Sequence, residues 1–380
     1  MTNIYLDHAA TSPIHPQVAE KMVSIMTGYF GNPSSIHSFG REARRILDES
    51  RSVIAESIHA EFSEIVFTSG GTEADNLAII GAALANKEKG NHIITTKVEH
   101  HAVLHSCEHL EKEGYDVTYL DPDENGMIEP EDVRMALREN TILVTVMFGN
   151  NEVGTIQPIG EIGRLLADHQ ALFHTDAVQA YGSETIDVKE MNIDLLSASA
   201  HKINGPKGIG FLYIRTGTKI RSGSFGGEQE QKRRAGTESI PSISGFAEAV
   251  SIAMATREKK NIQLRQMKKR FIDILKKEGI TFYLNGSQEH ALPHILNVSF
   301  PGTDVEALLV NLDMAGIAAS SGSACTAGSI EPSHVLVAMH GKRSERIRNS
   351  IRFSFGYGNT AEEAEEAAAK TAAIVRRLQT

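Results

Sequence analysis

The chain has 380 residues, of which 41% are hydrophobic and 23% are charged, a balance typical of a globular protein large enough for two domains. Its formal net charge of −10 argues against a nucleic acid or an anionic membrane surface as the main partner. The first residues show no secretory signal, no apolar run is long enough to span a membrane, and two distant cysteines do not suggest a disulfide. We therefore expect a cytoplasmic protein.

Short apolar segments in the first 255 residues predict strands at 64–68, 92–96, 116–121, 141–148, 171–176, 194–200 and 209–215. Several are apolar almost throughout, as expected of strands buried on both faces of a sheet. Helical patterns lie between many of them, at 70–89, 100–114, 129–140 and 158–170. This alternation predicts an α/β fold with a mostly parallel sheet.

The pattern changes near residue 240, where a long amphipathic helix is predicted over 241–279. Strands are then predicted at 281–286, 294–302 and 349–358, and helices at 304–316 and 360–379. We expect a large domain over residues 15–258. Residues 1–14 and 259–380 are expected to form a smaller α+β domain that carries a mobile loop at about 318–335.

Ligands of open α/β sheets bind beyond the carboxyl ends of the strands, so the ligand-binding residues are expected in the loops that follow strands. The segment "FTSGGTEADN" offers Gly71 and Thr72 at a predicted helix start, where backbone N–H groups favour phosphate. The same residues would also fit an ordinary turn and helix cap that binds no ligand. In "HTDAVQA", Asp176 ends a strand and could hold a cationic ring nitrogen, or could simply cap a helix.

Lys202 follows an apolar strand in "SASAHKINGPKGIG" and precedes a turn into another strand. A lysine in that position is expected to lose solvent, which lowers the pKa of its amine and frees it to bond with an aldehyde. Ser199 and His201 flank it with groups that could bind phosphate. Lys207, in the same turn, is interpreted as a surface charge.

Taken together, these motifs resemble those of the cysteine desulfurases of the NifS/IscS type, within the class V aminotransferases. The resemblance rests on "LDHAATSP", "SGGTEADN", "VEHHAVL", "GNNEVGTIQP", "HTDAVQA", "SASAHKINGPKGIG", "RRAGTES", "SSGSACTAGS" and "IRFSFG", and it covers almost the whole chain in order. It implies the PLP-dependent transferase fold, similar to that of aspartate aminotransferase, pyridoxal 5'-phosphate as cofactor, and a homodimer. It also implies removal of sulfur from L-cysteine, giving L-alanine and an enzyme-bound persulfide.

The resemblance implies a role for each matching residue. Lys202 would hold the cofactor covalently, His100 would stack on its ring and assist proton transfer, Asp176 would pair with the ring nitrogen, and Gln179 would contact the phenolic oxygen. Asn151 would lie beside substrate and cofactor, and Arg352 would bind the substrate carboxylate. The phosphate would be held by Gly71, Thr72, Ser199 and His201, together with Thr237 of the other subunit.

Cys325 lies in "AASSGSACTAGS", where no large neighbour offers a core to pack against. A thiol that must reach the cofactor and then an acceptor needs such small, flexible flanks. The resemblance assigns Cys325 as the nucleophile that takes the sulfur, and "SSGSAC" places the chain in the branch with the longer loop. Cys107, on the predicted helix 100–114, is the better candidate for an inert core cysteine.

Other interpretations are weaker. His101, His105 and His109 share a helix with metal-like spacing, but Glu108 and Glu111 suit an ordinary solvated helix, so no metal site is predicted. A small-substrate aminotransferase or a selenocysteine lyase would keep Lys202 and Asp176, but amino-group transfer would not need a cysteine on a mobile loop. A protein that only binds partners would need neither Lys202 nor Cys325. The sulfur acceptor is expected to be an iron–sulfur scaffold, a tRNA-thiolating enzyme or a dedicated apo-protein. Because the sequence ends soon after "AAIVRRLQT", a dedicated acceptor or a tRNA-modifying enzyme fits better than general cluster assembly.

Overall fold

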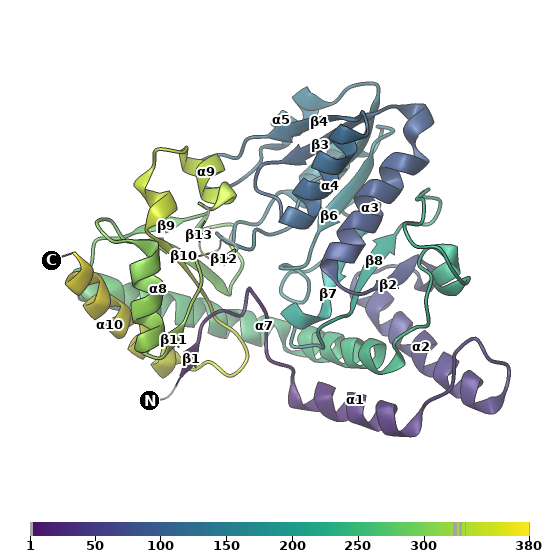
Figure 1. Ribbon diagram of the computed structural model, residues 1–380, viewed down its shortest axis with the longest axis horizontal. Helices are drawn as coiled ribbons and strands as arrows, with labels where there is room; N and C mark the ends of the chain where they lie inside the picture. The colour runs from purple at the N-terminus through teal and green to yellow at the C-terminus, as the bar shows by residue number, and fades with distance from the viewer. Residues whose placement is uncertain (1–2, 322–324, 327–328, 331, 380) are drawn as a thin grey trace.

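The computed structural model describes residues 3–321, 325–326, 329–330 and 332–379 (Figure 1). Its centre is a seven-stranded sheet with the order β2-β8-β7-β6-β5-β3-β4. These strands are β2 (Ile65–Thr68), β3 (His92–Thr96), β4 (Asp116–Leu120), β5 (Thr141–Thr145), β6 (Leu172–Asp176), β7 (Leu195–Ser199) and β8 (Gly210–Ile214). All seven strands predicted in this part of the sequence are confirmed.

The sheet is parallel except at β8, which pairs antiparallel with both β2 and β7. Only residues 200–209 join β7 to β8, and they include the short 3-10 helix η3 (Ala200–Lys202). So short a connection cannot carry the chain back to start a parallel strand, so β8 runs the other way. The predicted mostly parallel sheet is confirmed, and Lys202 lies in this tight return.

Helices cover both faces of this sheet, because alternate residues of its strands enter different apolar clusters. Leu212 of β8 packs in a cluster with residues of α3 (Gly71–Ala85) and α4 (His101–Lys112). Phe211 packs on the opposite face with residues of α1 (Pro16–Gly28), α2 (Ser38–Ser57), α5 (Pro130–Ala136), α6 (Ile159–Leu166) and α7 (Ile240–Lys277). The sequence prediction omitted α1 and α2; the others are confirmed.

The long helix α7 leaves the large sheet and enters a second apolar cluster (Figure 1). There an antiparallel sheet forms from β9 (Tyr283–Asn285), β10 (Ile295–Ser299) and β14 (Ser350–Ser354), covered by α8 (Val305–Met314) and α10 (Ala361–Leu378). The chain start joins this region, since β1 (Ile4–Tyr5) pairs in parallel with β11 (Ile317–Ala318). The predicted strands and helices of this region are confirmed.

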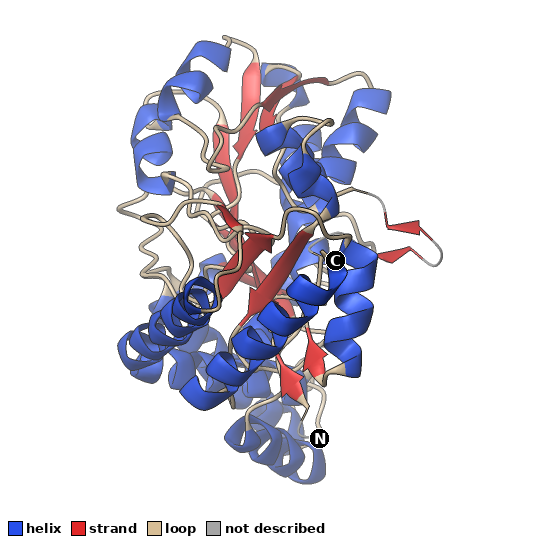
Figure 2. Cartoon of the chain, turned by 90° about the vertical axis from the view of Figure 1, so that its left-hand side faces the viewer, coloured by secondary structure: helices blue, strands red, loops and turns tan. Residues whose placement is uncertain are grey.

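Smaller elements complete the chain. They are α9 (His334–His340), the 3-10 helices η1 (Phe62–Glu64), η2 (Lys87–Lys89), η4 (Gln229–Lys232) and η5 (Glu345–Arg348), and the antiparallel pair β12 (Cys325–Thr326) and β13 (Ser329–Ile330). Figure 2 shows β12 and β13 standing away from the body of the molecule. Across the described residues, no helix is both long enough and apolar enough to traverse a bilayer.

Candidate active site

A cavity of about 310 Å³ lies beyond the carboxyl ends of the central strands. Asp176 is the last residue of β6, and Ser199 is the last residue of β7. The structure brings ten of the predicted site residues into its wall: Gly71, Thr72, His100, Asn151, Asp176, Gln179, Ser199, His201, Lys202 and Arg352. These residues come from distant parts of the sequence, so the fold itself assembles the site.

One end of the cavity is built to receive an anion. Helix α3 begins at Gly71, and its first N–H groups lack partners within the helix. A Cβ at Gly71 would lie 2.7 Å from Val178 Cγ2, so only glycine allows this close approach. Thr72 and Ser199 line the cavity here with hydroxyl groups. Donors of this kind, gathered at a helix N-terminus, suit a phosphate group.

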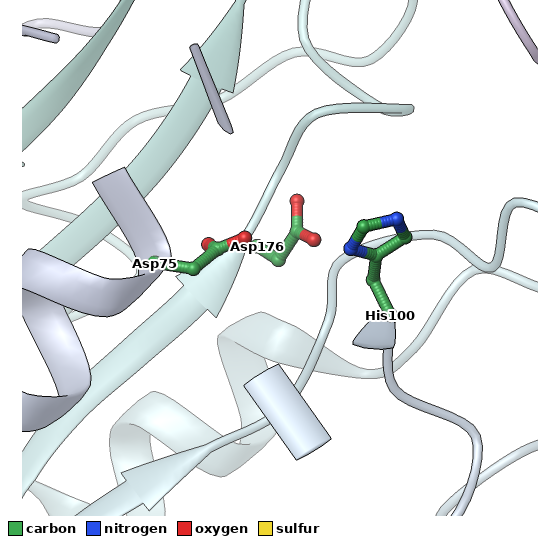
Figure 3. A group of neighbouring side chains, drawn as sticks. All are labelled: Asp75, His100 and Asp176. Atoms are coloured by element: carbon green, nitrogen blue, oxygen red, sulfur yellow. The ribbon is translucent and has the colours of Figure 1, made fainter. Parts of the chain in front are cut away.

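Two buried carboxyl groups, those of Asp75 and Asp176, also line the cavity. Asp176 lies between Asp75 and His100 (Figure 3), and the nearest polar atoms of these three residues lie within 4.8 Å of one another. Burial raises the pKa of Asp75 well above its usual value, and the neighbouring Asp176 raises it further. Burial also raises the pKa of Asp176, but His100, the Val178 N–H and Lys202 oppose that shift. We infer that Asp75 carries the proton while Asp176 is free to ionise against a cationic partner.

The sequence analysis missed Asp75, although it lies within the motif "SGGTEADN". Its exposed fraction is 1%, and its Oδ1 has no hydrogen-bond partner among the described residues. The nearest cation-forming group is the buried His174, whose Nε2 lies 3.6 Å from Asp75 Oδ1. An aspartate in the first turns of a helix is usually a solvated charge, so only the packing of α3 against the sheet reveals its burial.

The Lys202 amine is held by the start of the chain. Its Nζ donates hydrogen bonds to the carbonyl oxygens of Ala9 and of Ala10, the latter at 2.8 Å. Burial and the charge of Arg352 lower the pKa of Lys202 to about 8, against the opposing effect of Asp176. A larger share of this amine is therefore uncharged near neutral pH than for a lysine in water. An uncharged amine is the form that attacks an aldehyde.

Arg352 enters the cavity from β14 and is itself almost completely buried. Its Nη1 donates to the carbonyl oxygen of Asn151 at 2.8 Å, and its Nη2 pairs with Asp7 Oδ1 at 2.9 Å. The Arg352 Nε has no partner among the described residues. The guanidinium is thus fixed in place but keeps an unused donor, which suits it to bind a further carboxylate. Asp7 was another residue that the sequence analysis missed.

His100 and Gln179 complete the wall near Asp176. The Nδ1 of His100 accepts the Ala102 N–H at 3.1 Å and so caps helix α4. Desolvation lowers the pKa of His100, although Asp176 opposes this, so the ring is neutral at neutral pH. Gln179 donates through Nε2 to the Ala9 carbonyl at 2.9 Å, and its Oε1 lies 3.2 Å from His294 Nε2. His294 was not identified from the sequence.

The structure describes the setting of one of the two cysteines. Cys107 is buried in α4, and burial raises the pKa of its thiol to about 12, so the prediction of an inert core cysteine is confirmed. Cys325 begins β12, but its side chain lies outside the described part of the structure. Thr237 is exposed and does not line the cavity of its own chain.

The donor set fits the cofactor expected from the motifs. Its phosphate matches the anion-binding helix start, and its ring nitrogen matches the buried carboxylate. Its aldehyde matches the lysine of lowered pKa, and its ring face matches the neutral imidazole. Asp75, His100 and Asp176 are also close enough together to bind a metal ion. Because Lys202 is itself a cation in the same wall and Asp75 favours its protonated form, the arrangement fits the organic cofactor better.

Comparison with known proteins agrees with this geometry. The family model described as "Aminotransferase class-V" matches residues 4–366. A protein of Bacillus subtilis (strain 168), whose name includes the words cysteine desulfurase IscS 1, is 61% identical over 378 residues, which cover 100% of both chains. The cysteine desulfurase IscS of Methanosarcina thermophila is 49% identical, over 99% of this chain and 93% of that protein. A solved structure of SspA in complex with cysteine matches with a TM-score of 0.81 and 38% identity, over 93% of this chain and 98% of that one.

Proposed function

The chain belongs to the class-V aminotransferase family and is a pyridoxal-phosphate-dependent cysteine desulfurase, and we propose a role for each side chain of its active site. The observation that carries these roles is the single cavity in which Lys202, Asp176, His100 and Arg352 meet. When bound there, pyridoxal phosphate stabilises negative charge at the α-carbon of an amino acid and so eases the departure of a β-substituent. The family and the names of its close relatives make L-cysteine the substrate.

Two groups of residues in the cavity would hold the cofactor, one at its phosphate and one at its aldehyde and ring. Gly71, Thr72, Ser199 and His201 would bind the phosphate, with Thr237 of a second subunit. Lys202 would anchor the aldehyde carbon, and Asp176 would keep the ring nitrogen protonated, since a carboxylate is the partner that such a nitrogen needs. Gln179 would hydrogen-bond the phenolic oxygen, and its contacts with Ala9 and His294 fix its amide for that purpose.

The remaining residues act on the substrate. Arg352 and Asn151 would orient L-cysteine by its carboxylate, because the guanidinium is already fixed by Asp7 and retains a free donor. The neutral His100 ring would stack on the cofactor and hold a proton at its Nε2, since Nδ1 is used to cap α4. Lys202, with its lowered pKa, would move the proton at the substrate α-carbon.

Cys325 would accept the sulfur. Its thiolate would attack the sulfur of the substrate, so that an S–S bond forms while the bond between sulfur and the β-carbon breaks. Protonation of that carbon leaves L-alanine, and the enzyme keeps a persulfide, so no external oxidant or reductant is needed. The position of β12 away from the body of the molecule (Figure 2) supports the subsequent transfer to an acceptor.

The mass of the protein after incubation with L-cysteine tests this assignment. Without reductant, the native protein is expected to gain the mass of sulfur, and dithiothreitol should remove it. The chain offers a matched control, since Cys107→Ala should still gain sulfur while Cys325→Ala should not. If the Cys325→Ala protein also gained sulfur, the assignment would be wrong. If no protein gained sulfur while the cofactor spectrum still responded to amino acids, the reaction would be transamination.

The pKa of Lys202 predicts how cofactor loading depends on pH. Since only the uncharged amine attacks an aldehyde and its pKa is about 8, the loading rate of apo-protein should rise with pH and level off above that value. Below it the rate should change by about tenfold per pH unit. Stopped-flow absorbance after mixing with pyridoxal phosphate measures this rate. A free lysine analogue, whose pKa is about 10.4, should show no such plateau, and a protein rate that kept rising beside it would contradict the prediction.

A homodimer in the cytoplasm and a persulfide acceptor complete the proposal. Phe30 and Phe39 are exposed and their rings lie 5.1 Å apart, and Ile36 and Phe225 are exposed as well, which supports burial of apolar side chains against a second copy. Light scattering of the cofactor-loaded protein would measure its mass directly. The acceptor would be an iron–sulfur scaffold, a tRNA-thiolating enzyme or a dedicated apo-protein. Incubating each class with the sulfur-loaded enzyme, and measuring sulfur on the acceptor, separates these candidates.

A further inference from the structure

A second cavity, of about 290 Å³, lies beside the turn that follows Lys202; we call it the Lys260 cavity. Four parts of the chain form it: His15, Ile203 with Asn204, helix α7 between residues 249 and 267, and residues 356–359 after β14. It therefore lies next to two segments of the active site, the turn that carries Lys202 and the strand that carries Arg352. No role assigned above uses this cavity.

The wall of the Lys260 cavity combines apolar side chains with positive charge. Ile252, Leu264 and Met267 of α7 provide the apolar part. Lys259 and Lys260 of the same helix provide two amines, and the described residues that line the cavity include neither an arginine nor an acidic side chain. A concave site of this size and mixture is typical of a binding site for a small molecule.

The charge of Lys260 is not neutralised within the described part of the chain. No carboxylate there forms an ion pair with it, and the hydrogen bond of its Nζ to Asn204 Oδ1 is long, at 3.4 Å. Burial lowers the pKa of Lys260, and no neighbouring negative charge counters that effect. Lys260 is partly buried, and a partly buried cation without a counterion is disfavoured, whereas a bound anion would stabilise it.

A buried histidine, whose ring hydrogen-bonds Asn359, lies in the adjoining space. His8 has an exposed fraction of 6%, and its Nδ1 has no hydrogen-bond partner among the described residues. The ring packs against the backbone of Gly356, since a Cβ there would lie 2.1 Å from His8 Nδ1. A small cavity of about 40 Å³ is lined by His8, Lys260 and Asn204 and reaches Lys202. Lys260 thus lines both cavities, and the smaller one links it to the active-site wall at Lys202.

We propose that the Lys260 cavity binds a small organic anion, a carboxylate attached to a compact apolar body. The amine of Lys260 would pair with the carboxylate, and the apolar side chains of α7 would cover the hydrocarbon part. A phosphate ester fits this wall less well, because such groups are usually bound by arginine forks or by several backbone N–H groups at a helix start. The volume excludes a macromolecular segment of any length.

Calorimetric titration of the cofactor-loaded protein tests this proposal, with benzoate as the probe. Benzoate should bind with a Kd of about 1 mM or tighter. Benzamide, its neutral analogue, and the Lys260→Met variant should each show binding weakened by about tenfold or more, because a charged hydrogen bond is lost. Lys269→Met, an exposed lysine on the same helix and outside the cavity, should bind as the native protein does.

Several outcomes would overturn the proposal. Benzoate binding that survives in Lys260→Met would place the ligand elsewhere, for example at Arg352. Equal binding of benzamide, or binding of inorganic phosphate without benzoate, would exclude a site built for a carboxylate with an apolar body. Thermal unfolding without ligand provides an independent measure, because removal of an unpaired, partly buried charge should leave the Tm of Lys260→Met equal to or above that of the native protein. A clear fall in that Tm would show that Lys260 already has a counterion.

Discussion

Replacing Lys202 with alanine is expected to lower the desulfuration rate by about 10³-fold or more. The variant loses the amine that is proposed both to anchor the cofactor and to move the substrate proton. The structure supports a large effect because Lys202 is the only lysine lining this cavity among the described residues. Its lowered pKa of about 8 also sets it apart from a surface lysine.

Borohydride reduction followed by intact-mass measurement provides a test that does not depend on turnover. The native protein should gain the mass of the reduced cofactor, and Lys202→Ala should not. Lys207→Ala is the matched control, since Lys207 is an exposed residue of the same turn and should behave as the native protein does. A covalent adduct in Lys202→Ala, or its loss in Lys207→Ala, would show that the wrong lysine had been chosen.

Replacing Glu230 with alanine is expected to cause the largest loss of stability, about 3–5 kcal/mol of unfolding free energy. Glu230 accepts two hydrogen bonds from the buried Arg51 of α2, at 2.6 and 2.7 Å, and a third from the Phe67 N–H at 2.9 Å. The exposed fractions of Arg51 and Glu230 are only 5% and 6%. Removing the carboxylate would therefore leave a guanidinium uncompensated in the core.

Urea unfolding of the cofactor-loaded protein measures this loss. Glu228→Ala serves as the control, because its ion pair with Lys232 lies in the same segment but is exposed and should contribute about 1 kcal/mol or less. Glu230 has a left-handed φ of 47°, so Glu230→Gly separates backbone strain from loss of the carboxylate. If both Glu230 variants unfolded at the same urea concentration as Glu228→Ala, the buried pair would not be a major source of stability.

The parts of the fold that follow from local pattern were predictable. The seven strands of the large sheet are short apolar runs, and β5 and β7 are buried at every position, which is what such runs indicate. The carboxyl ends of parallel strands share one edge, so the meeting of Asp176 with Lys202 could be expected from the sequence. Helix α2 shows an apolar stripe through Ile46, Leu47 and Ile54, a signal that the prediction did not use.

The residues that were missed depend on packing between distant segments. Asp75 carries no local sign of burial, because α3 is buried by the sheet beneath it and not by its own amphipathic pattern. Asp7 becomes part of the site only because β1 runs beside β11 and brings it to Arg352. Such contacts across the chain leave no trace in the spacing of neighbouring residues.

The contacts of the chain start with Lys202 and Arg352 also affect how the active-site wall forms during folding. Asp7 pairs with Arg352, 345 positions later in the sequence, so the pair forms only when these two distant segments meet. Contacts between such distant residues form slowly, because a long loop must close before they are made. The amine of Lys202 depends on the same segment, because its carbonyl partners Ala9 and Ala10 lie 193 and 192 positions earlier in the sequence. We therefore expect the wall around Lys202 to be complete only after these long-range contacts of the chain start have formed.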